Sequence, residues 1–136
     1  MGKRRKYKPR SFESDGRPND TSANIYESMF QSKAFKDLTT KQRELYVYAK
    51  GQRYGKKKPG KDYKDYPEFQ GDELFYLNFG LVKAYEIYTE GNKGEFYKNI
   101  KALVEHGFIE VVSSGAKTHS KSIYRYSDRW QTWEDS

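Results

Sequence analysis

The stretch Asn92–Tyr126 reads NKGEFYKNIKALVEHGFIEVVSSGAKTHSKSIYRY and carries, in succession, the signals of a helix, a sharp stop and a β-hairpin. Asn92 suits an N-cap, and Glu95 three residues later completes the capping-box pattern. Gly107 can adopt the left-handed conformation that ends a helix, and Phe108 behind it can fold back onto the last turn. The pattern therefore predicts a helix from about residue 92 to residue 106.

This helix has two distinct faces. Its apolar residues recur at helical spacing and must enter a core: Phe96, Ile100, Leu103 and Val104. The opposite face is mostly cationic, with Tyr97 at its flank: Gly94, Lys98, Lys101 and Glu105.

Two short β-branched and aromatic runs follow the stop, at Ile109–Val112 and Ile123–Tyr126. Ten residues rich in Ser, Gly, Lys and Thr join them, which predicts a hairpin with a long tip. The segment from Ser113 to Arg125 contains Lys, Arg and His but no carboxylate. The alternation of Arg125 with Ile123 leaves Arg125 equally suited to supporting the hairpin and to binding a ligand.

An earlier helix is predicted from Thr39, which can cap it and form a second capping box with Gln42. It is expected to end near Gly51 or Gly55, and its apolar face is expected to consist of Leu45, Tyr48, Ala49 and Gln52. Residues 23–38 are apolar enough for either a short helix or an extended segment laid over the core.

A short strand is predicted at Leu74–Leu77, and Asn78 can cap a helix after it. The expected apolar residues of that helix are Leu81, Val82, Tyr85 and Tyr88. At the other end of the chain, Ser127 or Asp128 can start one turn that places Trp130 and Trp133 three residues apart and packs them back on the domain.

The composition indicates one modest domain with a polyanionic partner. The chain has 136 residues, a formal charge of +7 and an aromatic content of 17%, so Tyr and Phe rather than aliphatic residues are expected to build the core. Nucleic acid or an anionic membrane surface would suit the charge. No apolar run is long enough to span a bilayer and no secretory signal is evident, which predicts a cytoplasmic protein.

Two basic segments lie outside the predicted helices and strands, one before them and one between them. Residues 1–22 hold six cations in the first ten positions, with almost nothing to bury, and are expected to form a disordered arm. Residues 54–72 form a lysine-rich insertion interrupted by Gly and Pro. The arm is either a groove-binding element or a solubilising tail, and the insertion either contacts phosphates or is a solvated loop.

No catalytic or metal site is predicted. The two histidines, His106 and His119, lie thirteen residues apart, and the chain has no Cys. A cation at the end of a helix suffices to explain His106. The sequence GKKKPGK lacks the spacing and the Ser or Thr of a phosphate-binding loop. We therefore expect no enzyme, no cofactor and no bound metal.

The order of helix, strand, helix, helix, strand, wing and strand from Thr39 to Tyr126 resembles a winged helix-turn-helix domain of the α+β class. In this resemblance FYKNIKALVEHGFIE supplies the recognition helix and first wing strand, residues 23–136 form the domain, and residues 1–22 form the arm. More narrowly, the chain resembles small winged-helix proteins of Gram-positive plasmids, phages and integrative conjugative elements in combining AFKDLTTKQRELYVYAK, a lysine-rich insertion, FYLNFGLVKAYEIY and FYKNIKALVEHGFIE.

The resemblance implies which residues contact DNA. Lys98 and Lys101 would face the major groove or its phosphates, and Tyr97 would either contact DNA or pack against the preceding helix. The implied recognition-helix residues are Lys93, Gly94, Tyr97, Lys98 and Lys101. The implied wing residues are Lys117, Thr118, His119, Ser120 and Lys121. The implied arm and loop residues are Lys3, Arg4, Arg5, Lys6, Lys8, Arg10, Lys56, Lys57, Lys58 and Lys61.

The resemblance also implies a partner and a role. The partner is double-stranded DNA bound sequence-specifically, with a relaxase or replication protein as a further partner, in conjugative transfer or replication initiation. Three alternatives stay open: a repressor of the same fold, an adaptor that docks a larger protein, and an RNA-binding winged helix whose tyrosines stack on bases. Neither the target site nor the oligomeric state follows from one chain.

Overall fold

A computed structural model describes residues 9–17, 20–52, 73–113 and 122–134. It is an α+β structure in which helices pack against a small antiparallel sheet. The elements in chain order are α1 (Glu27–Phe30), α2 (Lys33–Asp37), α3 (Thr40–Gly51), β1 (Leu74–Tyr76), α4 (Phe79–Ala84), η4 (Glu90–Asn92), α5 (Lys93–Glu105), β2 (Ile109–Ser113), β3 (Ile123–Tyr126) and η5 (Arg129–Thr132).

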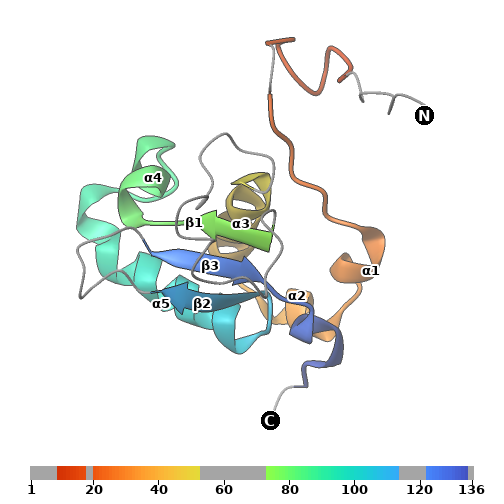
Figure 1. Cartoon of the computed structure of the whole chain (residues 1–136), viewed down its shortest axis with the longest axis vertical. Coiled ribbons are helices and arrows are strands. Elements are labelled where there is room, and N and C mark those ends of the chain that lie inside the picture. The colour runs from red at the N-terminus through yellow and green to blue at the C-terminus, as the bar shows by residue number, and fades with distance from the viewer. Residues whose placement is uncertain (1–8, 18–19, 53–72, 114–121, 135–136) are drawn as a thin grey trace.

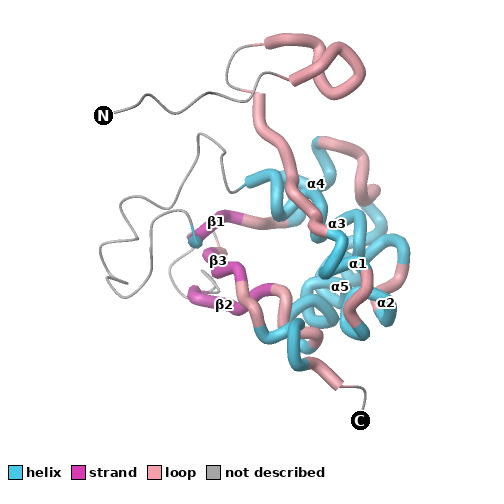
Figure 2. Tube along the Cα trace, turned by 90° about the vertical axis from the view of Figure 1, so that its right-hand side faces the viewer, coloured by secondary structure: helices cyan, strands magenta, loops and turns pink. Residues whose placement is uncertain are grey.

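The sheet has the order β1-β3-β2, with β3 antiparallel to both neighbours. Leu74 pairs with Arg125 at one end of β1, and Tyr76 pairs with Ile123 at the other. A bulge in β2 lies between Val111 and Ser113. Figures 1 and 2 show the three strands on one side of the molecule, with α2, α3 and α5 on the other. The predicted strands are confirmed to within one residue at each end.

Helix α3 begins as its sequence predicts. The Thr39 hydroxyl accepts a hydrogen bond from the backbone N–H of Gln42 (3.2 Å), and the Gln42 side chain accepts one from the backbone N–H of Thr39 (2.9 Å). The helix buries Leu45 and Ala49 as expected. It also buries Tyr46, which the predicted apolar face did not include.

The capping box predicted at Asn92 is wrong. The Asn92 side chain makes no capping hydrogen bond, because its backbone (φ −110°, ψ 25°) closes the 3₁₀ turn η4 instead of being extended. An N-cap side chain reaches the first turn of a helix from an extended backbone, so the turned conformation points the Asn92 amide elsewhere. Helix α5 nevertheless begins at the next residue and buries Phe96, Ile100 and Leu103.

The stop after α5 is confirmed. Gly107 has φ +81°, and the N–H of Phe108 donates to the Leu103 carbonyl (3.0 Å). The N–H of Gly107 donates to the Val104 carbonyl (3.1 Å), which completes a Schellman motif. Phe108 is fully buried, so the stop fixes the direction in which β2 leaves the helix.

Helix α4 is shorter than predicted. Asn78 caps it as expected, because its side-chain oxygen accepts from the N–H of Leu81 (3.0 Å). The helix ends at Ala84, where Glu86 adopts a left-handed backbone (φ +61°). Tyr85 is therefore exposed rather than on a buried helical face, and the buried Tyr88 lies beyond the helix.

The chain before α3 packs on the helices. Residues 23–38 are neither one helix nor one extended segment, because α1 and α2 are separate short helices and Ser32 caps the second. Met29, Phe35 and Leu38 enter the core. Residues 9–17 and 20–22 contain no helix or strand and are mostly exposed. Residues 1–8 of the predicted arm and the whole insertion at 54–72 lie outside the described residues.

The turn after β3 packs back on the domain as predicted. It is the 3₁₀ helix η5, in which the Trp130 ring lies parallel to Phe108 (centroids 6.1 Å apart, 6°). The Trp133 ring stacks on His106 (4.5 Å, 21°). The C-terminal segment thereby covers the end of α5.

The core mixes aromatic and aliphatic side chains. Phe35, Tyr46, Phe75, Phe96 and Phe108 are each at most 2% exposed, and so are several Leu, Ile and Val residues. The expectation of a core built from Tyr and Phe rather than aliphatic residues is therefore wrong. The spacing of apolar residues along a helix or strand determines which positions are buried, whether those residues are aromatic or aliphatic.

Two asparagines test the capping assignment. Asn78→Ala should lower the free energy of unfolding by about 1 kcal/mol, because it leaves an N–H of α4 without its acceptor. Asn92→Ala should change it by less than about 0.5 kcal/mol, the usual range for a surface substitution away from such features. Urea unfolding of both variants checks this, and an equal loss for both would contradict the described start of α5.

Candidate nucleic-acid interface

The solvent-facing side of α5 presents the residues expected for a recognition helix. Lys93, Gly94, Lys98 and Lys101 are all exposed. Lys98 forms no ion pair among the described residues, and Lys101 forms a weak one with Glu105 (3.9 Å). Such an exposed pair contributes little stability, so both ammonium groups can turn toward a phosphate.

Tyr97 lies at the edge of this surface. Its ring is 51% exposed and meets the ring of Phe96, its neighbour in the same helix, edge to face (5.1 Å, 67°). About half of the Tyr97 ring surface is therefore open to a ligand.

Carboxylates border the N-terminal end of α5. Glu95 is exposed in its first turn, and Glu90 in η4 pairs with Lys83 of α4 (2.5 Å). The hydrogen bond from Lys83 lowers the pKa of Glu90, so this carboxyl stays ionised. The cationic face of α5 is thus narrow, and it consists of Lys93, Lys98 and Lys101.

A buried polar network holds α5 against α3, and the sequence interpretation missed it. Asn99 is 3% exposed; its N–H donates to the Tyr88 hydroxyl (2.7 Å), and its carbonyl accepts from Gln42 (3.3 Å). Gln42 also belongs to the cap of α3. The signal was present, because Asn99 lies three residues after Phe96 and four before Leu103, on the buried face.

The base of the hairpin is held by ion pairs. Arg125 on β3 donates to Glu110 on β2 (2.7 Å), and Arg129 of η5 also reaches Glu110 (3.2 Å). These contacts favour the supporting role of Arg125 over ligand binding. Its neighbours at the expected tip of the wing, Lys117 to Lys121, lie outside the described residues.

The predicted arm and loop contacts are mostly outside the described residues as well. Of that set only Arg10 is described; it is exposed, and its backbone N–H donates to Glu13 (2.9 Å). The structure thus brings together the residues predicted for a recognition helix, while those predicted for the wing tip, the loop and the first eight positions lie outside the described residues.

The net charge is divided unevenly along the chain. The described residues hold 13 of the 26 Lys and Arg and 14 of the 19 Asp and Glu, which gives a net charge of −1. The remaining residues therefore carry +8, of which +5 lies in residues 1–8, +2 in 53–72 and +2 in 114–121, with −1 from Asp135. General attraction to a polyanion is expected to come from these segments rather than from the described residues.

His106 has a structural role, in agreement with the sequence interpretation. One ring nitrogen lies 2.7 Å from the Ala102 carbonyl, and the other lies 2.7 Å from a carboxylate oxygen of Asp37 on α2. Among the described residues, no group of three or more His, Asp or Glu lies close enough to hold a metal ion.

Comparisons with protein families, with curated proteins and with solved structures find no match. In the described part of the chain, no helix combines the length and the apolar character needed to cross a membrane.

Proposed function

We propose that this chain is a non-enzymatic, sequence-specific double-stranded DNA-binding protein of the winged helix-turn-helix type. The observation that carries the proposal is the placement of α5. The element order α3, β1, α4, α5, β2, β3, with β3 at the centre of the sheet, agrees with that architecture. In it α5 precedes the hairpin and presents Lys93, Lys98 and Lys101 to solvent.

The charge distribution supports a division of labour in binding. Lysines and arginines in residues 1–8, 53–72 and 114–121 supply attraction to phosphates, which is independent of sequence and falls steeply with salt. The α5 surface, with Tyr97 beside its lysines, supplies contacts to base edges. Affinity for any duplex and preference for one duplex therefore depend on different residues.

The biological role proposed is that of an accessory factor in mobile-element DNA processing, at a conjugative transfer origin or in replication initiation. The similarity of AFKDLTTKQRELYVYAK and FYLNFGLVKAYEIY to small proteins of such elements supports this role. A repressor of the same fold would use the same surface, and the position of the selected site relative to a promoter would distinguish it.

Selection of binding sites from a random duplex pool at moderate salt tests the proposal. Single-stranded DNA and RNA of equal length serve as competitors. We expect an enriched duplex motif that resists both competitors, because direct readout requires the major groove of B-form DNA. Preference for single strands would favour RNA binding. Equal competition by all three polyanions would contradict the proposal and favour an adaptor that docks a protein.

A further inference from the structure

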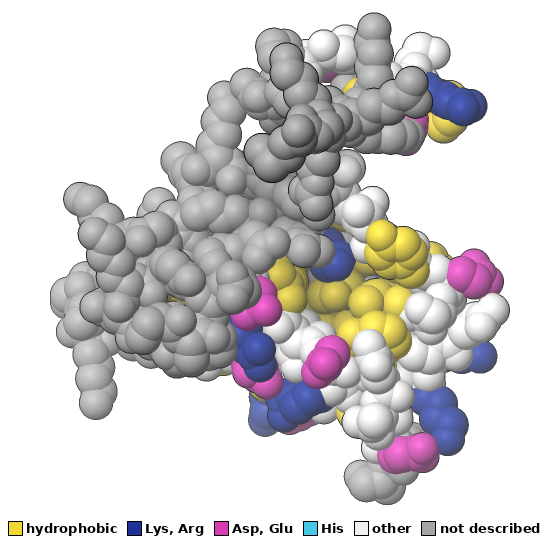
Figure 3. Space-filling model, turned by 45° about the vertical axis from the view of Figure 1, so that its right-hand side comes forward, with side chains coloured by type: hydrophobic (Ala, Val, Ile, Leu, Met, Phe, Trp, Pro, Cys, Tyr) yellow, Lys and Arg dark blue, Asp and Glu magenta, His cyan; other side chains and the backbone are white. Residues whose placement is uncertain are grey.

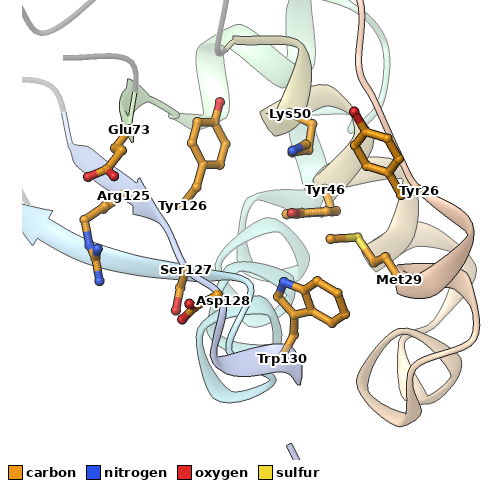
Figure 4. A pocket seen from close by; sticks show the side chains of 10 residues that line it. All are labelled: Tyr26, Met29, Tyr46, Lys50, Glu73, Arg125, Tyr126, Ser127, Asp128 and Trp130. Atoms are coloured by element: carbon orange, nitrogen blue, oxygen red, sulfur yellow. The ribbon is translucent and has the colours of Figure 1, made fainter. Parts of the chain in front are cut away.

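A pocket of about 380 Å³ lies between α1, α3, β3 and η5, at the end of the sheet where Leu74 pairs with Arg125 (Figure 4). The volume falls in the range of about 300–1,000 Å³ typical of sites for organic ligands. On the side of the molecule that carries α1, apolar side chains gather at the surface with charged ones beside them (Figure 3). The lining residues that matter below are Tyr26, Met29, Tyr46, Tyr126, Asp128 and Trp130.

Tyr46 directs an unpartnered hydroxyl into this pocket. The residue is only 2% exposed, yet its hydroxyl makes no hydrogen bond within the described part of the chain. No described side-chain N or O atom is both fully buried and without a partner, so the Tyr46 oxygen retains access to the pocket. Figure 4 shows it turned toward the space in front of Tyr126. Burial raises the pKa of Tyr46, so the hydroxyl keeps its proton and can donate.

Trp130 supplies a second donor at the same wall. Its indole N–H makes no hydrogen bond among the described residues, and Figure 4 shows the nitrogen on the side facing the pocket. Tyr46 and Trp130 both pack on Phe108, with ring centroids 4.9 and 6.1 Å from it. One fully buried ring therefore holds both donors in place.

Asp128 supplies an acceptor at the rim of the pocket. Its exposed carboxylate has no hydrogen bond or ion pair within the described residues. The neighbouring Arg125 and Arg129 form ion pairs with Glu110 and not with Asp128. A carboxylate accepts two parallel N–H bonds, so Asp128 favours a ligand with adjacent donors.

The rest of the lining combines aromatic and apolar side chains with the polar residues Lys50, Glu73, Arg125 and Ser127. The Tyr126 hydroxyl donates to the Ala49 carbonyl (2.6 Å), which fixes the orientation of its ring. Tyr26 is 71% exposed at the entrance, and Met29 lies beside it. A flat ring entering the pocket would meet aromatic surface, as bases do in proteins that bind single strands.

We propose that this pocket binds a single nucleobase, with guanine preferred. Guanine presents the acceptors O6 and N7, which suit the hydroxyl of Tyr46 and the N–H of Trp130. It also presents adjacent N–H donors at N1 and N2, which suit the Asp128 carboxylate. Adenine, cytosine and uracil lack this combination of two acceptors and two adjacent donors.

The base can come from a free nucleotide or from an unpaired position of a nucleic-acid strand. The pocket lies at the end of the sheet where Leu74 pairs with Arg125, opposite to the end where Tyr76 and Ser113 pair with Ile123. None of its lining residues belongs to α5, so neither source depends on duplex binding by that helix. The inference can therefore fail while the proposed function holds, and the reverse.

Isothermal titration of the full chain with neutral nucleosides tests the pocket without contributions from phosphates. Guanosine is expected to bind at least fivefold more tightly than inosine, which lacks the 2-amino group, and more tightly than adenosine or cytidine. A second arm compares a thymine oligonucleotide containing one guanine with an all-thymine oligonucleotide. Tighter binding of the guanine oligonucleotide without binding of guanosine would identify a strand as the source. Absence of both preferences would overturn the proposal.

Variants that each remove one donor and keep an aromatic side chain locate the site. Tyr46→Phe and Trp130→Phe should each weaken guanosine or guanine-oligonucleotide binding by about fivefold, the loss expected for one hydrogen bond. Tyr97→Phe on α5 is the matched control and should bind guanosine like the parent chain. Thermal unfolding of each variant verifies the fold. If both pocket variants fold and bind guanosine like the parent chain, the assignment is overturned. If either variant unfolds, Asp128→Asn at the exposed rim replaces it. The Asp128→Asn variant should lose the preference for guanosine over inosine.

Discussion

Replacing Gly107 with alanine is expected to destabilise the fold by roughly 3–5 kcal/mol, a large share of the stability of a typical domain. Two effects add. The left-handed backbone at φ +81° costs an alanine about 1–2 kcal/mol. A Cβ atom would also lie 2.6 Å from the backbone carbonyl carbon of Arg129 and from the backbone nitrogen of Trp130.

The second effect matters more because the obstructing atoms belong to backbone. Trp130 donates its N–H to the Gly107 carbonyl (3.0 Å), so η5 sits directly against the stop of α5. Moving η5 away would break this bond and loosen the contact of Trp130 with Phe108. Asparagine tolerates the left-handed conformation but still carries a Cβ, so Gly107→Asn should recover little of the loss.

Urea and thermal unfolding of Gly107→Ala, Gly107→Asn and Gly94→Ala measure these contributions. Gly94 lies in α5, and a Cβ atom at that position would meet nothing of the surrounding structure within 4 Å, so its replacement is the matched control. Alanine there should stabilise the chain by about 0.5–1 kcal/mol, because glycine is a poor helix former. A loss below about 1 kcal/mol at position 107 would show that η5 does not rest on the glycine.

A comparison of the ends of α5 and α4 shows why some helix boundaries could be predicted from the sequence and others could not. Gly107 predicts the end of α5, because glycine is the residue that adopts the left-handed conformation most readily. The stop of α4 has the same hydrogen bonds, from Ile87 to Val82 (3.1 Å) and from Glu86 to Lys83 (2.9 Å). It uses Glu86, which carries no such signal. The local sequence therefore predicted the end of α5 correctly but predicted α4 to be longer than it is.

Long-range contacts limited the prediction of sites. The exposed lysines of α5 follow from helical periodicity within one segment, so their common face could be predicted. The pocket combines Tyr26, Tyr46, Asp128 and Trp130, which lie up to about a hundred positions apart and meet only because α3 and η5 both pack on Phe108. No spacing rule relates these residues.

Reversing the charge of Lys98 and Lys101 together is expected to abolish preference for the selected duplex. Both side chains are exposed on α5. Loss of two such contacts should weaken binding to the selected site by about 100-fold or more. Residual, sequence-independent binding should persist, because the segments that carry the +8 are unchanged.

The matched control is the double variant Lys33→Glu and Lys36→Glu on α2, which brings the formal charge from +7 to the same +3. Both of these lysines are also exposed. Fluorescence anisotropy with the selected duplex and a scrambled duplex, at several salt concentrations, measures affinity and preference together. If both double variants lose affinity equally for both duplexes, net charge alone governs binding and α5 does not read sequence. If the α5 variant keeps its full preference, specificity must come from the wing, the loop or the arm. Loss of preference in the α5 variant alone would tie the cationic face of this helix to base recognition, because the two variants carry the same net charge. The control also removes the ion pair of Lys33 with Glu134 (3.1 Å), which is exposed and contributes little stability.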